Sequence, residues 1–338
     1  MTLPLLRGAE GDEWGALAAR LPVGWEAAAQ TTGALTRRRV FRTAPDLFQA
    51  LCCVVVGQCS LVEATHWIAL QGGPPVSAVA LHKRLKRSGP WFDWMLAQLC
   101  ARAQAPLPNW GRRVLVADAT VITRPGSQGT DYRIHALLNL GDLRWAGCLV
   151  TDAYTGEHLG CWTLQPGDLV LADRGYATAS NVAAARAQGA DVLIRWKRSH
   201  SGLRTPSGGP FDLAALVARV RPGTRLVERP SALRAPDGTL IPGRLLALRG
   251  AKRWLFLWTT LPRTVGAARI AGLYRSRWQV ELVFKRFKSL GEVDDLPNTA
   301  PATARAWLSV AATIQVVLDD WIAEMAVALP PPARCRAA

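Results

Sequence analysis

The apolar positions in the first third of the chain predict helices. An apolar stretch covers residues 47–56, within a longer segment, residues 44–100, whose pattern is helical. Ser60 and Glu63 then form an S-x-x-E capping box, which predicts the start of a helix ending near residue 70. The Gly/Pro-rich residues 71–75 predict a break after that helix.

A second helix is predicted to begin at Ser77, after this break. Its basic side chains are His82, Lys83, Arg84, Lys86 and Arg87. A helix, a short turn and a basic helix are typical of a helix-turn-helix DNA reader. A basic helix is also often only a solvated surface, so the pattern leaves both interpretations open.

Beyond residue 105 the pattern changes to alternating strands and helices. Residues 114–117 are continuously apolar, as expected of a strand covered on both faces, and we expect this strand to end at Asp118. Residues 132–140 and 144–151 predict an antiparallel hairpin through the Gly141-Asp142 turn.

A second buried strand, residues 169–172, leads directly to Asp173. An alanine-rich helix at residues 178–188 and a strand at residues 192–194 follow it. A three-stranded meander followed by strand, helix and strand is the order expected of a ribonuclease-H-like fold. The sequence therefore predicts the α/β class.

The predicted organisation has five parts. Residues 1–105 form an α-helical N-terminal DNA-end-binding region, and residues 106–198 form the first part of the ribonuclease-H-like core. Short strands punctuated by Gly and Pro predict a β-rich insertion at residues 199–262. The C-terminal helices of the core occupy residues 263–328, and residues 329–338 are a frayed tail.

Charge indicates a polyanionic partner. The 338 residues carry a formal charge of +16 and a pI near 10.4, which favours DNA or RNA. A membrane surface is the competing polyanion, but the most apolar late run, residues 307–318, is soon followed by acidic residues and predicts a buried helix. The first residues lack the pattern of an export signal, so we expect a cytoplasmic, nucleoid-associated protein without a membrane partner.

The cysteines predict buried free thiols rather than disulfides or a zinc site. They are odd in number, lie mostly in apolar context, and include no C-x-x-C pair. Their positions are Cys52, Cys53, Cys59, Cys100, Cys148, Cys161 and Cys335.

A fixed spacing of polar residues marks residues 274–288. Tyr274, Arg277, Glu281 and Lys288 stand at offsets of 0, 3, 7 and 14. On one helix these offsets fall within about 60° of one another, so a narrow face would carry a carboxylate between two cations and a phenol. Such a face suits a metal ion beside a phosphodiester. The alternative is an ordinary amphipathic helix, because apolar residues lie between these positions.

Three acids form the candidate catalytic set: Asp118, Asp173 and Glu281. Phosphodiester cleavage needs an activated water and stabilised attacking and leaving oxygens, which two divalent metals about 4 Å apart supply. Hard cations such as Mg²⁺ prefer carboxylate oxygens. Each aspartate taken alone could instead be a turn former or helix cap.

Three sequence words together resemble one known family. The spacing Y-x2-R-x3-E-x6-K, V-A-D-A-T around Asp118 and L-A-D-R-G-Y around Asp173 resemble the insertion-sequence DDE transposases of the IS-four type, over about residues 48–318. The resemblance implies that Asp118, Asp173 and Glu281 bind two Mg²⁺ ions, which Mn²⁺ can replace. It also implies phosphate contacts for a second set of residues: Tyr274, Arg277 and Lys288, with Arg174 and Tyr176 as weaker candidates.

Further expectations follow from the resemblance. In family members that form hairpins, an insertion-domain tryptophan stacks on a flipped base, and Trp254 is the best positional match, with Trp258 second. Strand tryptophans are usually core, so that alternative stays open. The basic residues Lys83, Arg84, Lys86 and Arg87 are expected to contact the terminal repeats of the element.

The expected function is that of a transposase. It would bind double-stranded DNA at terminal inverted repeats, free a 3′-OH by hydrolysis and join that hydroxyl to target DNA, as a homodimer in the synaptic complex. Only about fifty residues follow Lys288, fewer than in members with a long C-terminal dimerisation region, so the subunit contact is open. The alternatives are a nuclease of this fold without strand transfer and a catalytically inactive DNA-binding regulator, although the latter would not need all three acids.

Overall fold

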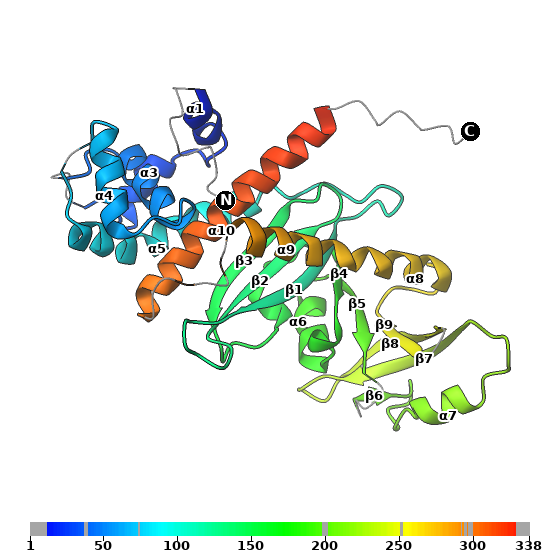
Figure 1. The fold of residues 1–338 in the computed structure, drawn as a ribbon. Coiled ribbons are helices and arrows are strands. Elements are labelled where there is room, and N and C mark those ends of the chain that lie inside the picture. Colours follow the sequence, from blue (N-terminus) through cyan, green and yellow to red (C-terminus); the bar gives the residue numbers. More distant parts are fainter. Residues whose placement is uncertain are drawn as a thin grey trace, which may run out of the picture.

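The computed structural model builds the chain around one mixed sheet of nine strands (Figure 1). It describes residues 12–36, 40–73, 75–197, 202–250, 253–291 and 300–328, together with Val293 and Leu296. Within this part of the chain the strand order is β3-β2-β1-β4-β5-β9-β8-β7-β6.

The first five strands have the order predicted for a ribonuclease-H-like core. β1, β2 and β3 form an antiparallel meander, β4 pairs in parallel with β1, and β5 pairs in parallel with β4. The strands are β1 (Val114–Ile122), β2 (Tyr132–Asn139), β3 (Trp145–Asp152), β4 (Leu169–Ala172) and β5 (Asp191–Trp196). The connections contain η2 (Leu159–Cys161), η3 (Arg174–Tyr176) and α6 (Ala179–Ala187). All five predicted core strands are therefore present.

One boundary differs from the prediction. We expected the first core strand to end at Asp118, but β1 continues to Ile122. The reason is the long antiparallel hairpin with β2, which pairs β1 residues up to Ile122 with Tyr132. Only the parallel pairing with β4 stops at Ala117.

Both faces of this sheet are covered by helices. Val114 and Val116 of β1 belong to one apolar core with residues of α9 (Gln279–Gly291) and α10 (Pro301–Ala328). The alternate β1 residues belong to a second core that includes residues of α6. Because strand side chains alternate between faces, the position of each β1 residue determines which helices it meets.

The β-rich segment extends the same sheet. Its elements are β6 (Leu203–Arg204), α7 (Leu213–Ala218), β7 (Leu226–Arg234), β8 (Leu240–Arg249) and β9 (Trp254–Thr259). β9 returns to pair antiparallel with β5, with Trp258 opposite Ile194. The segment therefore continues outward from the β5 edge of the core (Figure 1). Residue 199, its predicted start, lies outside the described residues.

The N-terminal region is helical, as predicted. Its helices are α1 (Asp12–Ala18), α2 (Trp25–Thr31), α3 (Ala44–Val55), α4 (Leu61–Leu70) and α5 (Ala78–Cys100). The Ser60–Glu63 capping box opens α4, and the Ser77 hydroxyl accepts a hydrogen bond from the Ala80 amide at the start of α5. α5 is much longer than a typical recognition helix, with 23 residues, and packs along α10 (Figure 1).

Helix α10 is the apolar helix predicted at residues 307–318. By length and composition it could cross a membrane, but 78% of its most apolar window is buried inside the protein. A buried core helix meets the same criteria, and the prediction of one is confirmed here. The predicted tail, residues 329–338, lies outside the described residues.

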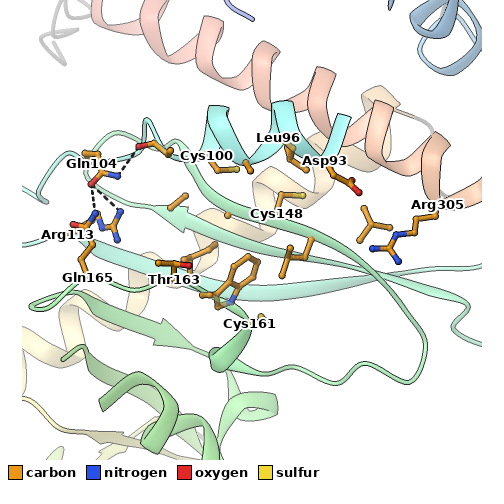
Figure 2. A pocket seen from close by; sticks show the side chains of 18 residues that line it. Asp93, Leu96, Cys100, Gln104, Arg113, Cys148, Cys161, Thr163, Gln165 and Arg305 are labelled. Atoms are coloured by element: carbon orange, nitrogen blue, oxygen red, sulfur yellow. Dashed lines mark hydrogen bonds between the residues drawn. The ribbon is translucent and has the colours of Figure 1, made fainter. Parts of the chain in front are cut away.

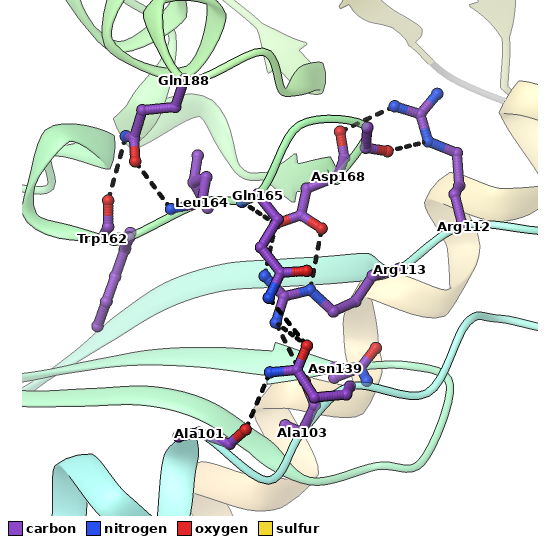
Figure 3. Close-up of polar contacts among 12 residues, drawn as sticks. Ala101, Ala103, Arg112, Arg113, Asn139, Trp162, Leu164, Gln165, Asp168 and Gln188 are labelled. Carbon is purple, nitrogen blue, oxygen red and sulfur yellow. Dashed lines mark hydrogen bonds and ion pairs between the residues drawn. The ribbon is translucent and has the colours of Figure 1, made fainter.

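A polar network joins the starts of the core strands (Figure 3). Arg113 donates from Nε and Nη2 to the two carboxylate oxygens of Asp168, at 2.9 and 2.6 Å. Arg112 donates to the Asp168 carbonyl at 2.9 Å and to the Asp191 carboxylate at 2.9 Å. Bidentate guanidinium–carboxylate pairs have a defined orientation. The network therefore connects the residues that begin β1, β4 and β5.

Candidate active site

The parallel pairing of β1 and β4 brings the two predicted aspartates together. Its last register pair is Ala117 with Ala172, so Asp118 and Asp173 are the next residues on neighbouring strands. By alternation both side chains follow the face of the sheet that packs against α9 and α10. Ligand sites in α/β sheets form at the carboxyl ends of parallel strands. The sheet thus places two carboxylates at such an end.

The polar signature at residues 274–288 lies on a broken helix rather than on the single helix predicted. Tyr274 is near the end of α8 (Ala267–Arg275), and Arg277 is in a 3-10 turn, η4 (Ser276–Trp278). Glu281 and Lys288 are on α9. The one turn of 3-10 helix changes the helical rotation between Tyr274 and Glu281. Tyr274, Arg277 and Lys288 nevertheless contact the core sheet or its carboxylates, and Glu281 pairs with Arg277.

Arg277 connects two of the three predicted catalytic acids. Its Nη1 donates to Asp118 Oδ2 at 3.1 Å, and its Nη2 donates to Glu281 Oε1. The Arg277 and Asp118 side chains are 18% and 17% exposed, whereas Glu281 is 58% exposed. Glu281 therefore lies at the solvent side of the cluster and reaches Asp118 through the guanidinium.

Tyr274 and Lys288 contact the backbone of the strands. The Tyr274 ring is buried and its hydroxyl donates to the Ala172 carbonyl at 3.3 Å, immediately before Asp173. Lys288 Nζ donates to the Val121 carbonyl at 3.3 Å. In this arrangement Tyr274 attaches α8 to the end of β4, and its phosphate contact stays a prediction.

Glu157 is a fourth acid at this site, and no sequence motif indicated it. Glu157 is half-buried in the loop between β3 and η2. Burial raises the pKa of its carboxyl, and the charges of Asp173 and Asp118 raise it further. Burial also raises the pKa of Asp118, while the Ala119 amide and Arg277 oppose that shift. Acids close to the end of β4 therefore interact unfavourably when all are ionised.

The chemistry of these donors fits a hard divalent cation. Carboxylate oxygens are the preferred protein ligands of Mg²⁺. Within the described residues, however, no three His, Cys, Asp or Glu side chains are grouped closely enough to hold a metal ion as they stand. Arg277 accounts for part of this, because it occupies the space between Asp118 and Glu281.

The two other candidates in the D-R-G-Y word, Arg174 and Tyr176, differ in solvent exposure. Arg174 is exposed and available to a ligand. Tyr176 is fully buried, so its alternative interpretation as a core residue is the correct one.

The two tryptophans predicted to stack on a base also differ in solvent exposure. Trp258 is fully buried, and its indole N–H donates to the Ser231 hydroxyl at 3.1 Å. The second-choice stacking role of Trp258 is therefore wrong, because the ring is core. Trp254 is half-buried, with the Arg249 guanidinium 5.7 Å from its ring centre. Part of the Trp254 ring can therefore meet a ligand.

The basic residues of α5 are not equivalent. Lys83, Lys86 and Arg87 are exposed. Arg84 is half-buried, and its Nη1 donates to the Ala34 carbonyl at 3.1 Å. Arg84 thus links α5 to the segment between α2 and α3.

A cavity with a volume of about 500 Å³ lies away from the candidate active site, between α5 and the β3 edge of the sheet (Figure 2). Cys100, Cys148 and Cys161 line it, together with Trp162 and Arg305. Most described cysteines are buried free thiols, as predicted, whereas Cys161 is exposed and Cys335 lies outside the described residues. None of the predicted catalytic acids lines this cavity, so the candidate site is defined by its chemistry rather than by its depth.

Comparison with known proteins identifies the family. A family model for the transposase DDE domain matches residues 109–315, a segment that contains Asp118, Asp173 and Glu281. The chain belongs to the DDE transposase family. It is therefore an enzyme of the transposase class, as the sequence words predicted.

Individual relatives agree with this assignment. The putative transposase InsL for insertion sequence element IS186A of Escherichia coli (strain K12) is 30% identical over 352 residues, which cover 92% of this chain and 94% of InsL. The transposase for insertion sequence element IS421 of Escherichia coli is 30% identical over 353 residues, with the same coverage. Among solved structures, the piggyBac transposase synaptic complex with hairpin DNA aligns with a TM-score of 0.51 at 10% identity, covering 98% of this transposase and 76% of piggyBac. That likeness concerns the fold.

Proposed function

We propose that this transposase binds the terminal inverted repeats of its own element, hydrolyses each end to free a 3′-OH, and joins that hydroxyl to target DNA. The observation that carries the proposal is that Asp118 and Asp173 directly follow the parallel pairing of β1 with β4, while Arg277 joins Asp118 to Glu281. The piggyBac transposase, solved as a synaptic complex with hairpin DNA, supports a DNA substrate.

In this proposal Asp118, Asp173 and Glu281 hold divalent metal ions, with two Mg²⁺ expected and Mn²⁺ as a substitute. Bound metal would polarise the phosphodiester and lower the pKa of the attacking water. Without metal, Arg277 neutralises the carboxylates of Asp118 and Glu281. When these carboxylates bind metal instead, the Arg277 guanidinium would be released to bind a phosphate oxygen of DNA. Lys288 and Arg174 supply further positive charge near the same end of the sheet.

The experiment that tests the proposal is a strand-transfer assay. Pre-cleaved repeat ends with a labelled 3′-OH are incubated with the protein, plasmid target and Mg²⁺. Labelled ends joined to the plasmid are the expected product. Pre-cleaved ends that stay unjoined, while an uncut repeat substrate assayed in parallel is cleaved, would instead indicate the nuclease alternative. Binding of both substrates with neither cleavage nor joining would indicate the inactive regulator.

The quaternary state is part of the proposal. One copy at each end of the element, as a homodimer in the synaptic complex, would bring the two ends together. Light scattering of the protein with repeat DNA should then give a mass for two chains and two ends. We also place this transposase in the cytoplasm with the nucleoid, since its +16 charge favours DNA.

We expect single alanine variants of Lys83, Lys86 and Arg87 to weaken repeat binding. Each lost phosphate contact should reduce the slope of log affinity against log salt by about 1. Arg84→Ala, by contrast, removes the contact with Ala34 and should lower the unfolding temperature. Binding across a salt series and thermal unfolding distinguish the two effects. If the slope is unchanged in all three exposed-site variants, α5 is a solvated face and not a DNA-binding surface.

We expect Trp254→Ala to accumulate nicked DNA while hairpin or double-strand product falls. Stacking of a base on an aromatic ring contributes on the order of 1–3 kcal/mol, which a late step would lose. Trp258→Ala is the contrasting variant, because removal of a fully buried aromatic costs roughly 3–5 kcal/mol of stability. Gel analysis of both reaction steps and circular dichroism are the measurements. Normal product from a folded Trp254→Ala protein would remove this residue from the mechanism.

A further inference from the structure

Glu157 and Asp173 share a narrow space at the end of β4. Their oxygens Glu157 Oε2 and Asp173 Oδ1 both lie within 3.0 Å of the point that a Cβ on Gly175 would occupy. Asp173 Oδ1 also accepts a hydrogen bond from the Gly175 amide at 2.6 Å. The glycine of the D-R-G-Y word therefore gives Glu157 room to approach Asp173, because any side chain there would overlap its carboxylate.

Neither acid of this pair has a salt-bridge partner in the described part of the chain. Arg277 pairs with Asp118 and Glu281, and the Glu157 carboxylate accepts no hydrogen bond from the described residues. Arg133 and Lys197 lower the pKa of Glu157 only from beyond ion-pair distance. Two neighbouring carboxylates without a compensating cation repel each other, and either a shared proton or a bound cation would relieve this repulsion.

The Tyr176 hydroxyl is an independent observation at the same place. It is buried and has no hydrogen-bond partner among the described residues. Tyr176 belongs to η3, the 3-10 turn that Asp173 caps, and burial together with charges that include Glu157, Asp118 and Asp173 raises its pKa. Buried polar groups without a protein partner commonly bind ordered water or a ligand. A hydrated cation held by Glu157 and Asp173 would supply such a partner to the Tyr176 hydroxyl.

We propose that Glu157 supplies a fourth carboxylate to the metal site of this transposase, next to Asp173. This inference rests on the proposed function, because it needs Asp118, Asp173 and Glu281 to hold divalent cations. Glu157 would be a metal ligand, directly or through a metal-bound water that the Tyr176 hydroxyl also contacts.

The test is Mn²⁺ binding by calorimetry to the full-length protein without DNA. Four proteins are compared: the wild type, Glu157→Gln, Asp118→Asn and Glu26→Gln. Glu26 is exposed at the start of α2 and makes the last variant a matched control for loss of one carboxylate charge. We expect Glu157→Gln to bind Mn²⁺ on the order of tenfold more weakly than the wild type, or to lose one of two binding events, and Glu26→Gln to be unchanged.

Thermal unfolding in EDTA separates this role from a structural one. Glu157→Gln removes a negative charge beside Asp173, so without metal it should unfold at the same temperature as the wild type or higher. With saturating Mn²⁺ it should gain less stability than the wild type does. If Glu157→Gln is too unstable to purify, Glu157→Asp keeps the charge on a shorter side chain and should show weakened Mn²⁺ binding in the same assay.

Different outcomes overturn different claims. Wild-type Mn²⁺ binding that Asp118→Asn abolishes and Glu157→Gln leaves unchanged overturns the role of Glu157 alone, and a shared proton then explains its approach to Asp173. A lower unfolding temperature in EDTA with unchanged Mn²⁺ affinity overturns it in favour of a structural role. No Mn²⁺ binding by the wild type overturns the proposed metal chemistry and, with it, this inference.

Discussion

Glu281→Gln, Asp118→Asn and Asp173→Asn are each expected to abolish DNA cleavage while keeping affinity for the terminal repeat. Each change removes a metal-binding charge and nearly preserves shape. Stabilisation of a phosphoryl-transfer transition state by metal ions contributes several kcal/mol, so the cleavage rate should fall roughly a thousandfold or more. Gel shift and nicking assays on the same labelled DNA measure binding and cleavage in parallel.

The structure also predicts how these variants differ in the absence of DNA. Glu281 is mostly exposed, so its pair with Arg277 contributes little stability and Glu281→Gln should unfold at the wild-type temperature. Asp118 is largely buried, and Asp118→Asn leaves Arg277 without that partner. Glu26→Gln is the control and should cleave normally. Near wild-type nicking in Mg²⁺ by Glu281→Gln would remove Glu281 from the active site.

The core of the fold follows from local patterns in the sequence. Continuously apolar runs at residues 114–117 and 169–172 predicted the two central strands, because only a sheet covered on both faces buries every side chain. The Ser60–Glu63 capping box predicted where α4 begins, and the Gly141-Asp142 turn predicted the connection between β2 and β3. Both predicted aspartates directly follow these runs, and the parallel pairing of β1 with β4, which stops at Ala117 and Ala172, makes them neighbours.

Other features depend on contacts between distant segments, which no local pattern encodes. The 3-10 turn η4 contains no proline or glycine from which it could be predicted. Arg277, in this turn, donates a hydrogen bond to Asp118. Trp254 and Trp258 lie on the same strand with the same alternation, so only the burial of each ring in the folded protein shows that Trp258 is core. Glu157 follows a glycine in a loop without a strand-end pattern, and its nearness to Asp173 appears only in three dimensions.

A second large effect is expected at the opposite ends of the catalytic strands. Asp168→Ala should lower the free energy of unfolding by about 3–5 kcal/mol, because it leaves the Arg113 guanidinium buried without its carboxylate. The Arg113 and Asp168 side chains are only 9% and 3% exposed. The backbone N–H of Gln165 also loses its acceptor, the Asp168 carboxylate. Urea unfolding gives the measurement, and Asp237→Ala, in an exposed turn, is the control that should unfold close to the wild type.

The Arg113–Asp168 pair also bears on the active site, because β4 has only four residues between Asp168 and Asp173. A strand this short transmits a displacement at its start to its end, so Asp168→Ala protein that still folds should cleave DNA more slowly. The double variant Arg113→Met with Asp168→Leu removes both charges and should recover most of the lost stability. If Asp168→Ala cost less than about 1 kcal/mol, Arg113 must find another partner, and Gln104 already accepts a hydrogen bond from its Nη1 at 3.4 Å. In that case Arg113→Met, which removes the guanidinium itself, should be equally mild.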